Sequence, residues 1–206
     1  QVLINNSACL WQALCLWKCI IQTVLYFHGF ESNCQTEKFA RTKAFFAAHG
    51  LELIGLDVNY AEIPPPVIDQ IVSEIFSRHD VVACVGCSLG GYWANRSAVL
   101  HLVTAAIVNP ALKFYQSHLK KYPELAAYKH EAMYTESNMA PRLVMLGTAD
   151  KVLDYRVAEA AFSEKEVTLV KGGSHAGYDF LDAFLQAAWL TIKQADFCGT
   201  EWTLLI

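Results

Sequence analysis

The stretch Val81-Val82-Ala83-Cys84-Val85-Gly86-Cys87-Ser88-Leu89-Gly90-Gly91 decides the fold, because it joins an apolar run to a helical pattern through a glycine-rich turn. The apolar run predicts a buried strand, and the residues from Tyr92 to Leu102 predict a helix. A strand that reverses sharply into a helix strains its turn residue and brings neighbouring backbone close, so that only glycine fits beside it. The pattern therefore has the form of a nucleophile elbow that exposes Ser88.

The elbow pattern by itself allows two interpretations. Ser88 is either a reactive hydroxyl or a small residue that fills space in a tight turn of a parallel sheet. In the first case the backbone N–H of Leu89 and the positive end of the following helix face the region where negative charge develops during acyl transfer. The rest of the chain is needed to decide between them.

Short β-branched runs alternate with helical patterns after residue 22, which is typical of a mostly parallel sheet covered on both faces. We predict strands at Thr23–Phe27, Leu51–Asp57, Val81–Val85, Ala105–Val108, Arg142–Leu146 and Glu166–Val170. We predict helices directly after the elbow and at Glu37–His49, Pro66–Arg78, Val157–Phe162 and Asp179–Lys193. The fold class is therefore α/β, with a doubly wound sheet of about six strands.

The composition of the 206-residue chain indicates one globular domain. Hydrophobic residues make up 54% of the chain and charged residues 17%, which argues against extensive disorder. The net charge of -4, with scattered Lys and Arg, argues against nucleic-acid binding. Seven cysteines without metal-ligand spacing favour a reducing compartment, and we expect neither metal nor redox chemistry at Cys84-x-x-Cys87.

Three segments flank or interrupt the predicted domain, which spans residues 23–195. Residues 1–22 are apolar, but Lys18 interrupts them short of a membrane span, so we expect an N-terminal extension rather than a signal peptide or anchor. Residues 196–206 are expected to form a C-terminal tail. Residues 111–140 contain no readable strand and form either a short helical lid over the ligand-binding crevice or a surface helix pair, and we favour the lid.

Two loops carry the partners that a serine nucleophile needs, namely a histidine to accept its proton and a carboxylate to orient that histidine. Asp150 and His175 each follow a different predicted strand, in loops that open on the same edge of the sheet as the elbow. The order Ser88, Asp150, His175 is the one expected for this triad on a doubly wound sheet. Asp154 is an alternative acid, but we expect it to cap the next helix and prefer Asp150.

The turn after the first predicted strand supplies a second donor for an oxyanion. In His28-Gly29-Phe30 the glycine lets the Phe30 N–H face the Leu89 N–H, and these two groups form the predicted oxyanion hole. We assign His28 and Tyr92 to the substrate-binding region. His28 is expected to brace the loop by hydrogen bonding rather than to act as a base, and Tyr92 to line an acyl pocket with Phe30 and aromatic residues of segment 114–134.

Five strings of the sequence, in this order, resemble the YqiA-like esterases, a compact branch of the α/β-hydrolase superfamily. The resemblance covers about residues 23–190 and rests on Leu25–Phe30, Val85–Tyr92, Val108–Ala111, Val152–Arg156 and Gly172–Ala176. The chain departs from the family pattern at Cys87, where a second serine is common, and residues 1–22 have no counterpart. The segment 111–140 also looks short for the family.

The resemblance implies a serine hydrolase without a cofactor, which cleaves small-molecule carboxylic esters, acyl thioesters included, in the bacterial cytoplasm. It implies Ser88 as nucleophile, Asp150 as acid, His175 as base, and Phe30 with Leu89 as oxyanion donors. Two other classes stay open. The chain could be a non-catalytic receptor or interaction protein that keeps the fold, or its triad could act on a peptide or a carbon–carbon bond. Retention of all three triad candidates favours an enzyme.

Overall fold

The computed structural model describes residues 21–113, 116, 119–129, 131–136 and 140–202. Nearly all of the predicted apolar extension and the last four residues of the predicted tail lie outside the described residues. The same holds for parts of the predicted lid, including the aromatic residues 114 and 115 that were expected near the acyl pocket.

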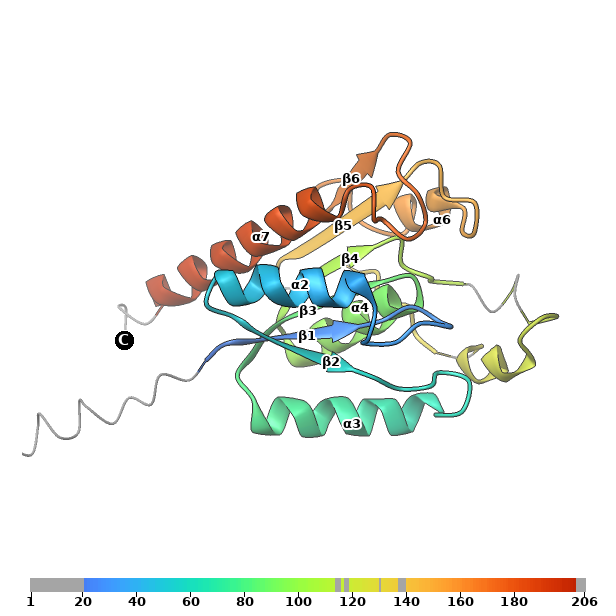
Figure 1. The fold of residues 1–206 in the computed structure, drawn as a ribbon, viewed down its shortest axis with the longest axis horizontal. Coiled ribbons are helices and arrows are strands. Elements are labelled where there is room, and N and C mark those ends of the chain that lie inside the picture. Colours follow the sequence, from blue (N-terminus) through green and yellow to red (C-terminus); the bar gives the residue numbers. More distant parts are fainter. Residues whose placement is uncertain (1–20, 114–115, 117–118, 130, 137–139, 203–206) are drawn as a thin grey trace, which may run out of the picture.

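Six parallel strands form one sheet in the order β2-β1-β3-β4-β5-β6, as Figure 1 shows. The strands are β1 (Thr23–Phe27), β2 (Glu52–Leu56), β3 (Val81–Cys87), β4 (Thr104–Val108), β5 (Arg142–Gly147) and β6 (Val167–Val170). The order reverses between β1 and β3, so the carboxyl ends of these strands open a crevice where ligands bind in such sheets. The predicted doubly wound sheet is confirmed.

Helices cover both faces of the sheet because successive strand residues point to opposite faces and both sets are apolar. The helices are α2 (Glu37–Ala48), α3 (Pro65–Arg78), α4 (Leu89–His101), α6 (Tyr155–Glu159) and α7 (Leu181–Trp202). Along β1, Leu25 packs into the core with Trp93 of α4, whereas Val24 packs into the core with Leu185 of α7. Figure 1 shows α2 and α7 together on one face of the sheet.

Two helices differ from their predicted bounds by more than one residue, namely α6 and α7. Thr36 caps α2 by accepting a hydrogen bond from the Phe39 N–H, as expected at a helix start. The helix α6 begins at Tyr155, earlier than predicted, because Asp154 caps it, and it ends earlier than predicted, at Glu159. The predicted end of α7 at Lys193 is wrong, since the helix continues to Trp202. That stretch contains no proline, and a single glycine does not end a helix.

The segment between β4 and β5 is held at its exit by two buried polar side chains. Its described part contains a short 3-10 helix, η1 (Pro123–Tyr128), and no strand. Arg142 of β5 donates hydrogen bonds to the carbonyls of residues 134–136 and forms an ion pair with Glu166. Asn95 of α4 donates to the carbonyls of residues 133 and 134. These bonds fix the exit of the segment to the sheet, while its action as a lid stays a prediction.

Candidate active site

Ser88 stands between β3 and α4 in a strained backbone conformation, with φ 58° and ψ -125°. The glycines around it allow a close approach of backbone. A Cβ at Gly86 would lie 2.2 Å from the Gly90 carbonyl oxygen, and one at Gly90 would lie 2.1 Å from the Phe27 carbonyl oxygen. The Ser88 N–H donates to the Val108 carbonyl at the end of β4. The strand, turn and helix predicted for the elbow are therefore confirmed as geometry.

We expect Gly90→Ala to lower the free energy of unfolding by about 3 kcal/mol, because the added methyl meets backbone oxygens of β1 that cannot move aside without distorting the sheet. Urea unfolding would measure the loss. Gly29→Ala is the matched control, since a Cβ there lies 3.5 Å from the nearest atom, an ordinary contact. Equal stability of the two variants would contradict the role of close approach at Gly90.

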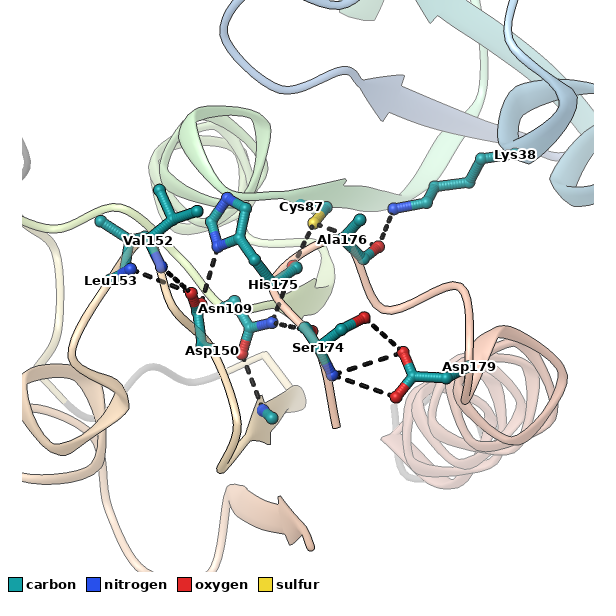
Figure 2. A network of polar contacts seen from close by, with 11 residues as sticks. Lys38, Cys87, Asn109, Asp150, Val152, Leu153, Ser174, His175, Ala176 and Asp179 are labelled. Carbon is teal, nitrogen blue, oxygen red and sulfur yellow. Dashed lines mark hydrogen bonds and ion pairs between the residues drawn. The ribbon is translucent and has the colours of Figure 1, made fainter. Parts of the chain in front are cut away.

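Asp150 and His175 form a direct pair, with His175 Nδ1 2.7 Å from Asp150 Oδ2 (Figure 2). The other oxygen of the carboxylate accepts hydrogen bonds from the N–H groups of Val152 and Leu153, at 2.7 and 2.9 Å. A carboxylate only accepts hydrogen bonds, so Nδ1 carries the proton and Nε2 of the neutral ring is free to accept one. Asp154, the alternative acid, caps α6 instead.

The surroundings of Asp150 keep it charged although its side chain is fully buried. Burial raises the pKa of Asp150, but the hydrogen bonds from His175, Leu153 and Val152 outweigh it and hold the pKa below its ordinary value. The His175 side chain is 22% exposed, so the pair joins a buried anion to a ring that borders solvent.

The lowered pKa of Asp150 predicts a pH-dependent contribution to stability. The pKa of Asp150 in the folded protein lies below the ordinary value of 3.8. The charged carboxylate therefore stabilises the folded state above about pH 3.8, and this stabilisation is lost as the pH falls through the pKa of the folded state. We expect the difference in free energy of unfolding between wild type and Asp150→Asn to be larger at about pH 7 than at about pH 3. Urea unfolding at both pH values measures it, and an equal difference would contradict the assignment.

The loop that carries His175 is held by Asn109, a buried residue at the end of β4 to which the sequence analysis assigns no role. Its Nδ2 donates to the carbonyls of Ser174 and His175, at 3.0 and 2.8 Å, and its Oδ1 accepts from the Gly147 N–H at 2.8 Å (Figure 2). Asn109 itself has a positive φ of 44°, which asparagine tolerates better than most residues. An asparagine placed directly after a strand, on the edge that carries the elbow, was the available signal.

If His175 takes part in catalysis, we expect Asn109→Asp to lower kcat by about 100-fold, because small displacements of a catalytic group have effects of this size. The carboxylate has the same shape but cannot donate to the Ser174 and His175 carbonyls, so the loop is released. Steady-state kinetics would measure the loss, with thermal unfolding of the variant as the check on its fold. A folded variant with unchanged kcat would show that Asn109 does not position His175.

A cavity of about 340 Å³ brings together four of the predicted site residues: Ser88, His175, Phe30 and Leu89. Tyr122 and Leu125, from the segment between β4 and β5, also line it; the remaining lining residues are Glu31, Ala111, Lys121, Val152 and Leu153. Leu89 is the first residue of α4, so its N–H has no acceptor within the helix.

Ser88 and His175 share this cavity without a hydrogen bond between them in the part of the chain that the structure describes. Catalytic hydrogen bonds often tighten only when substrate binds, so this arrangement is compatible with a triad. The hydrogen bond between His175 and Asp150 is formed, and it determines which nitrogen of the His175 ring carries the proton.

His28 and Tyr92 do not line this cavity, which corrects their assignment to substrate binding. Both are 2% exposed. The Tyr92 ring packs edge-on against Trp93 and Tyr128, because η1 covers this side of α4. His28 Nδ1 lies 2.7 Å from the Gly29 carbonyl oxygen, and its Nε2 accepts from the Val58 N–H at 3.4 Å. His28 thus braces the loop as expected, from behind the site.

No three His, Cys, Asp or Glu side chains among the described residues gather as a metal site. Cys84 packs in the core under α4 and Cys87 against the core under α7, as strand alternation predicts.

Within the described segments, no helix has the length and apolar character needed to cross a membrane.

The chain matches the model of an uncharacterised protein family, UPF0227, over residues 23–191. It belongs to this family. A UPF0227 protein from Pasteurella multocida, PM0825, is 28% identical over 155 residues, which cover 68% of this chain and 82% of the relative. The UPF0227 protein YcfP from Salmonella arizonae is 25% identical over 164 residues, or 74% of this chain and 89% of the relative. The family resemblance predicted from the sequence is confirmed.

Solved structures similar to this UPF0227 chain show its fold. Est1E from Butyrivibrio proteoclasticus, solved with ferulic acid bound, aligns with a TM-score of 0.68 at 12% identity, over 84% of this chain and 88% of Est1E. XC6422 from Xanthomonas campestris, described as an α/β serine hydrolase without a lid, aligns with a TM-score of 0.58 at 12% identity, over 84% and 81% of the two chains. The α/β-hydrolase fold is therefore confirmed.

Proposed function

We propose that this protein is a serine hydrolase that cleaves carboxylic esters, acyl thioesters included, through an acyl-enzyme intermediate. The observation that carries the proposal is the 2.7 Å pair of His175 and Asp150 beside a cavity that also holds the strained Ser88. Backbone strain at a serine that lines a cavity supports a functional role, because strained residues cluster at active sites. The α/β-hydrolase fold of the chain agrees with this chemistry.

The first half of the proposed reaction forms the acyl-enzyme. Ser88 Oγ attacks the carbonyl carbon of the ester while His175 Nε2 accepts the hydroxyl proton. The charge that develops on the carbonyl oxygen is stabilised by the N–H groups of Phe30 and Leu89, and the positive ring of His175 is stabilised by Asp150. His175 then gives its proton to the leaving alcohol or thiol as the bond to the acyl group breaks.

The second half releases the acid. Water enters the site, His175 accepts one of its protons, and the resulting hydroxide attacks the carbonyl carbon of the acyl-enzyme. Ser88 leaves and recovers its proton from His175, which restores the starting state. Leu125, Val152 and Leu153 supply apolar surface to the 340 Å³ cavity, so this cavity suits a small-molecule ester with an apolar acyl group of modest size.

A fluorophosphonate probe tests the proposal, since it phosphonylates activated serines irrespective of substrate. We expect stoichiometric labelling of the wild type and none of a folded Ser88→Ala variant. Cys87→Ala is the matched control, because Cys87 is the neighbouring nucleophile and its loss should leave labelling intact. A folded wild type that the probe does not label would overturn the proposal and favour a non-catalytic binding protein.

A further inference from the structure

A second cavity, of about 190 Å³, borders the same reactive residues from the other side. It shares Phe30, Ser88 and His175 with the larger cavity, so one substrate can extend into both. Its remaining walls come largely from the start of α2, the loop before it and the His175 loop, and include Ser32, Thr36, Lys38, Cys87, Ala176 and Tyr178.

The charge of the small cavity is one-sided. Lys38 lines it and no carboxylate among the described residues does, whereas the larger cavity has both Glu31 and Lys121 in its walls. The Lys38 ammonium donates to the Ala176 carbonyl and lies 4.9 Å from the centre of the Tyr178 ring. Figure 2 shows Lys38 reaching from α2 to Ala176, close to Cys87. An ammonium has three donors; one goes to the Ala176 carbonyl and a second faces the Cys87 thiol, so at least one remains for a ligand.

Hydroxyl groups add further donors to the small cavity. The Tyr178 hydroxyl accepts a hydrogen bond from the Lys38 backbone N–H at 3.3 Å, and the Thr36 hydroxyl accepts one from the Phe39 N–H at 3.3 Å. Each hydroxyl keeps its own proton to donate. A cavity whose described walls combine a cation with hydroxyl donors and hold no carboxylate is complementary to an anion.

We propose that the small cavity binds a carboxylate carried by the substrate, with Lys38 as its main partner. This inference rests on the proposed function and names a class of substrate for it: esters with an apolar group on one side of the scissile bond and a compact acidic group on the other. Since a water molecule occupies about 30 Å³, the small cavity has room for about six atoms of that size, enough for a carboxylate on a short chain.

The test compares two matched pairs of esters. In the first pair a dicarboxylic acid monoester is compared with its methyl-capped diester, which places the charge on the acyl side. In the second pair a butyrate ester of a hydroxy acid is compared with that of the corresponding hydroxy amide, which places the charge on the alcohol side. We expect kcat/KM to favour the anionic member of one pair by about 10-fold or more, the size of one charge-assisted hydrogen bond.

Lys38→Gln should remove this preference and Lys38→Arg should retain most of it. Because Lys38 also holds the Ala176 carbonyl in the histidine loop, its loss slows neutral esters too, but the ratio within each pair cancels that effect. Lys43→Gln is the matched control, since Lys43 is an exposed lysine of the same helix that lines neither cavity. It should leave the preference unchanged.

Two results would overturn the inference while the proposed function stands: turnover of neutral esters without preference for either anionic ester, or a preference that survives Lys38→Gln. Absence of turnover for all four esters, together with absence of fluorophosphonate labelling at Ser88, would instead overturn the proposed function and this inference with it.

Discussion

Ser88→Ala should lower kcat/KM for ester hydrolysis by about 10⁴-fold or more, because removal of a triad nucleophile leaves only the catalysis supplied by binding and oxyanion stabilisation. The substitution removes one oxygen and keeps the Cβ, so the strained backbone at φ 58° has the same steric demand in both proteins. It therefore changes the chemistry of the site far more than its shape. Steady-state hydrolysis of a short-chain aryl ester measures the loss.

The neighbouring cysteine makes the result specific. Cys87→Ala removes a heavier atom from the adjacent position, whose thiol contacts the His175 carbonyl at 3.5 Å, and it leaves every proposed reacting group in place. We therefore expect its loss of activity to be far smaller than that of Ser88→Ala. Ester hydrolysis that persists in a folded Ser88→Ala protein would show that Ser88 is not the nucleophile.

The positions of the strands and of Asp150 and His175 could be predicted because simple rules determine them. Buried parallel strands appear as short apolar runs, and parallel strands present all their carboxyl ends at one edge of the sheet. Asp150 and His175 follow β5 and β6 at that edge, so their convergence follows from the strand order alone. The spacing of the glycines likewise predicts that backbone atoms approach Gly90 closely.

The direction of individual side chains could not be predicted in the same way, because it depends on elements far away in the chain. The sequence analysis assigns Tyr92 to the substrate pocket, yet η1 packs Tyr128 against its ring and removes it from that surface. The role of Asn109 depends on hydrogen bonds to residues 38 to 66 positions away. The small cavity beside Lys38 forms only where α2 packs near the loop that carries His175, and no local sequence pattern predicts it.

Asp150→Asn should lower kcat by about 10³- to 10⁴-fold while preserving the shape of the site. The Asp150 oxygens accept three hydrogen bonds, two from the N–H groups of Val152 and Leu153 on one oxygen and one from His175 on the other. An asparagine keeps its oxygen for the two N–H groups and turns its NH₂ toward the ring. Nδ1 must then accept a hydrogen bond, the ring proton moves to Nε2, and Nε2 can no longer take the proton of Ser88.

The alternative acid supplies the control for this substitution. Asp154→Asn makes the same chemical change four residues further along, at the cap of α6, where the asparagine still caps the helix. Its kcat should stay close to that of the wild type. If Asp154→Asn instead loses the activity and Asp150→Asn keeps it, the carboxylate that serves the histidine has been misassigned. If both variants keep it, the 2.7 Å contact at His175 orients a ring that takes no part in proton transfer.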